Sequence, residues 1–198
     1  MYRKYKDRPE GKDVQYYLAR TLYKSGKYAQ ALVRFYKFWD PKENLKQTLN
    51  VSKYREISTM LLECPDPTQK VNAADIASKA TEELLKKLNG EIKLEEWVVP
   101  ATAERLKNNP EEFRKYVEAM KNQLNKNLAK ANGVIADYFL EQEKDLQKAT
   151  PYLQKALKAY LDLIPDSMRH KSVNPDYYDI LFARAEIRKT LKQYDAEG

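Results

Sequence analysis

The single cysteine and the single histidine are the residues whose chemistry could make this chain an enzyme. Cys64 and His170 could form a thiol–imidazole pair in which the histidine activates the nucleophile. Such a pair requires two remote loops to meet, and the sequence offers no oxyanion donor beside either residue. An exposed loop histidine among basic residues is the simpler interpretation of His170. One cysteine excludes an internal disulfide framework and a cysteine-based zinc site, and one histidine excludes a histidine-rich metal site.

Adjacent glutamates are the remaining candidates for acid–base chemistry. They form the pairs Glu82–Glu83, Glu95–Glu96 and Glu111–Glu112. Neighbours on a helix point about 100° apart, so such carboxylates do not share a site. The sequence has no glycine-rich phosphate loop, no H-E-x-x-H and no G-x-S-x-G motif. We therefore expect a non-catalytic protein without a metal or a cofactor; an enzyme, or an accessory domain of one, stays an alternative without a nominated site.

Positive charge and tyrosine gather in the first third of the chain. The 198 residues carry a net charge of +7, and residues 1–60 hold 14 basic and 6 acidic side chains. Eight of the 15 tyrosines lie before residue 55. Such a segment can bind nucleic acid through phosphate contacts and stacking, or an acidic protein surface, or anionic lipid. It can equally be a solvated lysine face with tyrosines packed between helices.

Helical patterns dominate the whole sequence, and no stretch alternates as a strand does. Proline, glycine and asparagine break the pattern into segments of helical length. At one of these breaks, Asn109 and Pro110 form a typical helix start. The expected helices cover 13–25, 28–39, 43–63 with a break near Asn50, 68–88, 94–107 with Pro100 in the first turn or at a kink, 110–139 as one helix or two joined near Gly133, 146–164 and 176–193. We therefore expect an all-α fold of about eight helices. No apolar run approaches the ~18 residues that span a membrane.

Residues 12–40 resemble a tetratricopeptide repeat (TPR), a pair of antiparallel helices. The most specific fragment is Leu-Tyr-Lys-Ser-Gly-Lys-Tyr-Ala-Gln-Ala-Leu at 22–32. The matching positions are Leu18, Ala19, Leu22, Gly26, Tyr28, Ala31 and Phe35. The departures are Gln15 in place of tryptophan, Phe38 in place of the last alanine, and Pro41 two residues early.

Two further stretches look like relatives of this unit. The resemblance divides the chain into a basic lead at 1–11, a TPR-like hairpin at 12–41, a non-matching helical region at 42–130, a second TPR-like hairpin at 131–165 and a partial unit at 166–198. It implies stacked hairpins that form a short α-solenoid; a generic helical bundle with one chance match is the alternative. The non-matching region holds either degenerate helical pairs or an inserted subdomain. The chain ends where a second helix of the last unit would begin, so we expect a fragment of a longer protein or an unpaired last helix.

The TPR resemblance also implies a binding surface, because the first helix of each repeat lines the concave groove of the family. The implied partner-binding residues are Tyr16, Arg20, Tyr23, Lys24, Tyr138, Arg184 and Arg188. The resemblance implies a non-catalytic scaffold that binds a protein or peptide of acidic character. In the alternative, Tyr16 and Tyr23 pack against a neighbouring helix. Tyr16 and Arg20 occupy the positions where chaperone-tail clamps of this family have a lysine and an asparagine, so such a clamp is not expected.

A nucleic-acid-binding helical repeat is the second hypothesis, and it rests on the basic, tyrosine-rich first third. Families that read bases need a regular repeat with the same reading position each time, and this chain is irregular. Steep salt dependence of binding would distinguish the two hypotheses. One unpaired cysteine, and a start without the apolar core of a signal peptide, lead us to expect a cytoplasmic protein.

Overall fold

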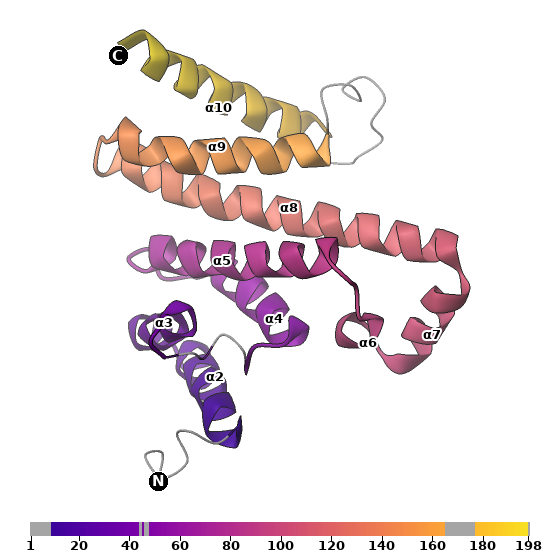
Figure 1. Ribbon diagram of the computed structural model, residues 1–198. Coiled ribbons are helices and arrows are strands. Elements are labelled where there is room, and N and C mark those ends of the chain that lie inside the picture. Colours follow the sequence, from indigo (N-terminus) through magenta and orange to yellow (C-terminus); the bar gives the residue numbers. More distant parts are fainter. Residues whose placement is uncertain (1–8, 44, 46–47, 165–176, 198) are drawn as a thin grey trace.

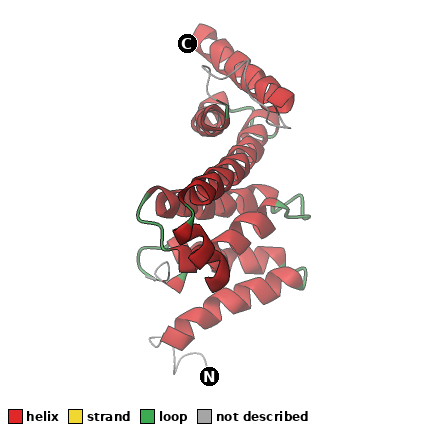
Figure 2. Ribbon diagram, turned by 90° about the vertical axis from the view of Figure 1, so that its right-hand side faces the viewer, coloured by secondary structure: helices red, strands yellow, loops and turns green. Residues whose placement is uncertain are grey.

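The structure is a computed structural model that describes residues 9–43, 45, 48–164 and 177–197, with side chains from 13 to 192 within those ranges. All the regular structure in this part of the chain is helical, which confirms the all-α class (Figures 1 and 2). The helices are α2 (Pro9–Lys24), α3 (Tyr28–Tyr36), the 3-10 turn η1 (Lys37–Trp39), α4 (Val51–Leu62), α5 (Lys70–Asn89), α6 (Leu94–Trp97), α7 (Pro100–Asn108), α8 (Pro110–Glu141), α9 (Leu146–Leu163) and α10 (Tyr177–Glu197).

The helices stack in chain order from one end of the molecule to the other (Figure 1). The α2–α3 pair contacts the α4–α5 pair through α3 and α5, then α5 packs on α8, α8 on α9 and α9 on α10. The short helices α6 and α7 lie beside this stack, against α4 and the first half of α8. The non-matching region therefore contains one antiparallel pair, α4–α5. That the pairs are repeats of one unit stays a prediction.

Local signals place most helix ends where the sequence predicts them. Gly26 ends the first hairpin turn with a φ of +78°, a left-handed conformation that glycine adopts at little cost. The side chain of Asn109 accepts a hydrogen bond of 3.2 Å from the amide of Glu112 and caps α8. Asn50 caps α4 in the same way, with its side-chain oxygen 2.9 Å from the amide of Lys53. The predictions for Gly26 and Asn109 are confirmed; at Asn50 the sequence predicted a break and not this cap.

Two predicted boundaries are wrong. The helix expected from residue 43 begins only at Val51, because Asn50 is extended and caps the helix from outside. The helix expected over 94–107 is two helices, α6 and α7, separated by an extended Val98 and Val99. A residue before proline avoids the α conformation, which explains the break at Val99 before Pro100.

Helix α8 runs for 32 residues without a break at Asn132 or Gly133. Asn132 is 1% exposed, and its side-chain amide donates to the hydroxyl of Ser78 on α5 at 3.2 Å and to the carbonyl of Leu128 at 2.8 Å. The asparagine that reads as a helix breaker in the sequence is thus a buried contact between two helices.

Gly133 is the position at which we expect a stabilising substitution. A Cβ added there meets no atom within 4 Å, and the backbone is helical. Gly133→Ala should raise the free energy of unfolding by about 0.5–1 kcal/mol, because alanine loses less conformational entropy in a helix. Gly26→Ala is the matched control; its φ of +78° should make the same change destabilising by about 1 kcal/mol. Urea unfolding measures both, and equal signs would contradict the prediction.

The largest core joins α2, α3, α4, α5 and the middle of α8. Its fully buried members include Phe35, Ile57, Ile76 and Leu84. The α8–α9 contact is built differently, on small residues such as Ala136 and Ala149, which are 0% exposed and let the two helices approach closely. None of the helices in the described ranges is long and apolar enough to cross a bilayer.

Candidate partner-binding surface

The predicted groove residues of α2 lie at its contact with α4. Tyr16 is 2% exposed and its hydroxyl donates to one carboxylate oxygen of Glu56, while Nε of Arg20 donates to the other. Tyr23 is 7% exposed and donates to the backbone carbonyl of Met60 at 2.9 Å. The expectation that Tyr16 and Tyr23 face an open groove is therefore wrong, because both rings fill the space between helices. The packing alternative is confirmed for these two residues.

Glu56 is an ionised acceptor at the centre of this contact. Burial favours its protonated form, but hydrogen bonds from Tyr16 and Arg20, together with the positive charge of Arg20, lower its pKa below the usual range. Burial and the same carboxylate raise the pKa of the Tyr16 hydroxyl, which stays a donor. The charge of Arg20 is thus offset within the chain, although its side chain is 35% exposed.

A second ion pair ties α2 to α4 one turn away. Nζ of Lys53 lies 2.5 Å from Oδ1 of Asp13 and 3.1 Å from the carbonyl oxygen of Thr48. The ammonium group also lies 5.5 Å and 5.9 Å from the ring centroids of Tyr16 and Tyr17. Because the Lys53 side chain is only 11% exposed, its ammonium group stabilises the contact between the helices and is not presented at the surface.

One strip of each helix remains open to solvent beside this contact. On α2 it contains Tyr17, Arg20 and Lys24, which are three and four residues apart and share a face. On α4 it contains Ser52, Arg55 and Thr59 at the same spacing, all three exposed. Because Arg20 of the α2 strip bonds to Glu56, the residue that follows Arg55 on α4, the two strips border the same helix contact. We call these six residues the α2–α4 face.

A pocket of about 340 Å³ lies at the edge of this face. Its α4 wall is Ser52 and Arg55; its other wall is formed by Glu96, Trp97, Val98 and Val99 at the end of α6. Nη1 of Arg55 donates to the backbone carbonyl of Trp97 at 3.2 Å and joins the two walls. The sequence does not indicate this pocket, because its walls lie about 40 residues apart in a region without a motif.

The other predicted binding residues lie elsewhere. Tyr138 is 38% exposed on α8, with its ring edge-on to Phe139. Arg184 is 2% exposed and its Nη1 donates to the carbonyl of Ile164 at 2.7 Å, where a cation stabilises the end of α9. Arg188 is half-buried on the same helix, α10, at the opposite end of the stack from α2 (Figure 1). The predicted seven residues therefore do not form one site, and Arg184 is not available to a partner.

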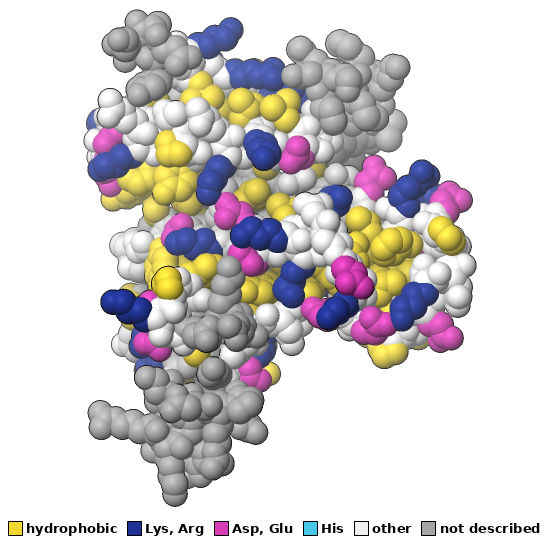
Figure 3. Space-filling view, viewed as in Figure 1, with side chains coloured by type: hydrophobic (Ala, Val, Ile, Leu, Met, Phe, Trp, Pro, Cys, Tyr) yellow, Lys and Arg dark blue, Asp and Glu magenta, His cyan; other side chains and the backbone are white. Residues whose placement is uncertain are grey.

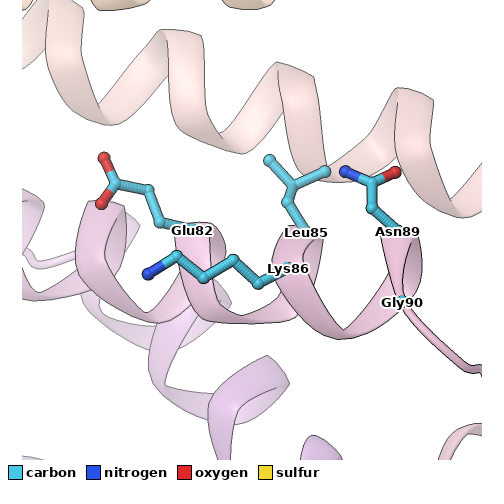
Figure 4. Close-up of a pocket in the computed structure, with 5 residues that line it drawn as sticks. All are labelled: Glu82, Leu85, Lys86, Asn89 and Gly90. Atoms are coloured by element: carbon cyan, nitrogen blue, oxygen red, sulfur yellow. The ribbon is translucent and has the colours of Figure 1, made fainter.

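A second depression, of about 500 Å³, follows the end of α5. Figure 4 shows Glu82, Leu85 and Asn89 directed toward α8, with Lys86 along the front of the helix. Lys155 of α9 pairs with Glu82 at 2.9 Å, and Lys86 pairs with Glu83 at 3.0 Å. Acidic and basic side chains alternate over this side of the molecule (Figure 3). Because these charges neutralise one another, the depression indicates no charged ligand.

The described residues contain no cluster of side chains that could hold a metal ion. No three His, Cys, Asp or Glu side chains gather among them as metal ligands would. Cys64 is buried, and His170 lies outside the described residues, as do residues 1–8 of the basic lead. The expectation that His170 is an exposed loop histidine, and the less favoured Cys64–His170 pair, are therefore not tested.

Comparison with protein-family models, with curated proteins and with solved structures finds no match to this chain.

Proposed function

We propose that this protein is a non-catalytic interaction module that binds a partner protein through the α2–α4 face. The observation that carries the proposal is a 54%-exposed tyrosine, Tyr17, on the same strip of α2 as the exposed Lys24, while Arg55 lies on the exposed strip of α4. Neither Lys24 nor Arg55 forms an ion pair with another described residue. Tyrosine and arginine often supply most of the binding energy at protein interfaces.

Two features favour a protein partner over nucleic acid. Stacking on bases needs exposed rings, and Tyr16, Tyr23 and Tyr54 are buried. Phosphate binding needs available cations, and Lys53 and Arg20 are paired with carboxylates of the chain itself. Three of the tyrosines and two of the cations of this third of the sequence are thus used in holding helices together.

The TPR-like assignment belongs to the same proposal. The hairpins α2–α3 and α4–α5 follow one another, and α2 contacts α4 through Tyr16, Arg20 and Lys53. A contact between successive first helices is what a stack of TPR-like hairpins requires. The single cysteine suits a reducing compartment, and we include a cytoplasmic location in the proposal on that ground.

Capture from the source lysate after nuclease treatment tests the function. The variant is Tyr17→Ala/Lys24→Glu, and the matched control is Tyr178→Ala/Lys158→Glu, which makes the same changes at exposed positions of α10 and α9. We expect the α2 variant to bind the captured partner at least about tenfold more weakly, which is about 1.4 kcal/mol, and the control to bind it as the wild type does. Circular dichroism first establishes that all three chains are folded.

Other outcomes of this experiment would count against the proposal. Loss of all binding on nuclease treatment would favour the nucleic-acid hypothesis. Equal recovery of a partner by the wild type and the α2 variant would show that the α2–α4 face is not the binding surface.

A further inference from the structure

The pocket between α4 and α6 is built by a loop that the core holds in place. Trp97 is 5% exposed and inserts into the main core, and its carbonyl receives the hydrogen bond from Arg55. Val98 and Val99 follow in extended conformation, so the chain leaves α6 along the pocket wall. A wall fixed at Trp97 and Arg55 gives the pocket a defined shape before any partner arrives.

The lining combines apolar surface with one unneutralised cation. Val99 is 66% exposed and lines the pocket together with Val98 and Trp97. Glu96 is the one acidic residue of the lining, and its Oε2 atom lies 3.7 Å from Nζ of Lys87 on α5, with which it forms an ion pair. Arg55 has no carboxylate partner among the described residues, and Lys24 adds a second such cation to the adjoining face.

The geometry points to one occupant, and this inference rests on the proposed function. We infer that the pocket receives an apolar side chain of an acidic peptide segment in the partner, and that a carboxylate of the same segment pairs with Arg55. A volume of about 340 Å³ is at the lower end of ligand pockets, about 300–1,000 Å³, and suits a single side chain. Alternate residues of an extended peptide face the same side, so the segment should carry its acidic residue two positions from its apolar residue.

Fluorescence anisotropy with a designed probe tests the inference directly. The probe is a labelled peptide of alternating glutamate and serine with one central leucine two positions from a glutamate. Its controls replace the leucine with alanine or every glutamate with glutamine. The protein variants are Val99→Ser, Arg55→Gln and, as a distant control, Lys158→Gln. Serine is a favoured residue at the N-cap position that Val99 occupies, so α7 should stay folded.

We expect the leucine probe to bind the wild type about tenfold more tightly than the alanine probe, since burying a leucine is worth about 1.5–3 kcal/mol. This ratio should fall below about threefold in Val99→Ser. Arg55→Gln should weaken binding of the glutamate probe about fivefold or more and reduce its salt dependence, and Lys158→Gln should change neither quantity. Circular dichroism and urea unfolding verify that each variant is folded.

Equal affinity for the leucine and alanine probes, or no binding of either, would overturn the inference. The capture experiment separates this failure from failure of the proposed function. If Tyr17→Ala/Lys24→Glu loses the partner and Val99→Ser retains it, the α2–α4 face is the binding surface and the pocket is not part of it. If all variants retain the partner, both the proposed function and the pocket inference are wrong.

Discussion

Replacing Phe35 with alanine is expected to lower the free energy of unfolding by about 3–5 kcal/mol. The Phe35 side chain is 0% exposed at the centre of the main core, and its ring lies edge-on to Tyr16 with the centroids 6.4 Å apart. Alanine removes the whole ring and leaves a cavity that surrounding helices cannot fully close. A loss of this size is a large share of the 5–15 kcal/mol by which a domain is normally stable.

Loss of the Phe35 ring should also disturb the candidate binding surface. Tyr16, which Phe35 supports, bonds to Glu56 and orients the α2–α4 contact. Phe182→Ala is the matched control, because this ring on α10 is 69% exposed and its removal should change stability by less than about 0.5 kcal/mol. Urea denaturation followed by circular dichroism measures both variants. Similar losses for the two would contradict the described core.

Glu56→Gln should give the second-largest effect, a loss of about 1–2 kcal/mol at neutral pH. The amide keeps the shape of the side chain but loses the charge that accepts hydrogen bonds from Tyr16 and Arg20. The pair is about one-third exposed, so solvent screening holds the loss below that of a fully buried ion pair. Tyr16→Phe serves as a control that removes one donor and keeps the pairing with Arg20.

The difference between wild type and Glu56→Gln should depend on pH. The pKa of Glu56 is lower in the folded chain than the unfolded value of about 4.3, so its carboxylate contributes stability above that value. The contribution is lost as the pH falls through the folded-state pKa. The two proteins should therefore differ at pH 7 and become nearly equal once the pH lies below the folded-state pKa of Glu56. A difference that stays constant over this range would show that the charge of Glu56 does not stabilise the contact.

Helix ends were the most predictable feature of this fold because they depend on neighbours in sequence. Gly26 supplies a left-handed turn residue, and Asn109 and Asn50 supply caps for the helices that follow them. Where the local sequence allows two conformations, it could not choose between them. Asn132 and Gly133 are compatible with a helix break or with a helix interior. In the structure they lie inside α8, where Asn132 forms a hydrogen bond with Ser78 on another helix.

The candidate site was less predictable, since exposure depends on which helix packs against which. Tyr16 and Tyr23 have the residue type of a binding face, yet α4 covers both. Arg184 has the same type as Arg20 and lies buried against the end of α9. The sequences of α2 and α10 do not indicate which residues will pack against them, because the packing residues lie 20 to 40 positions away along the chain.

The sequence by itself determined an all-α chain, its hairpin turns and a basic, tyrosine-rich first third, because periodicity, caps and composition act over a few residues. Tertiary structure alone decided which of those charges and rings remain available. Glu56 and Asp13 neutralise Arg20 and Lys53, and packing on α4 buries Tyr16. Tyr17, Lys24 and Arg55 are among the side chains that remain exposed, and Arg55 lines a pocket whose walls meet only when the end of α6 packs on α4. The physical reason is that burial and ion pairing are long-range properties, set by contacts between segments that local sequence does not encode.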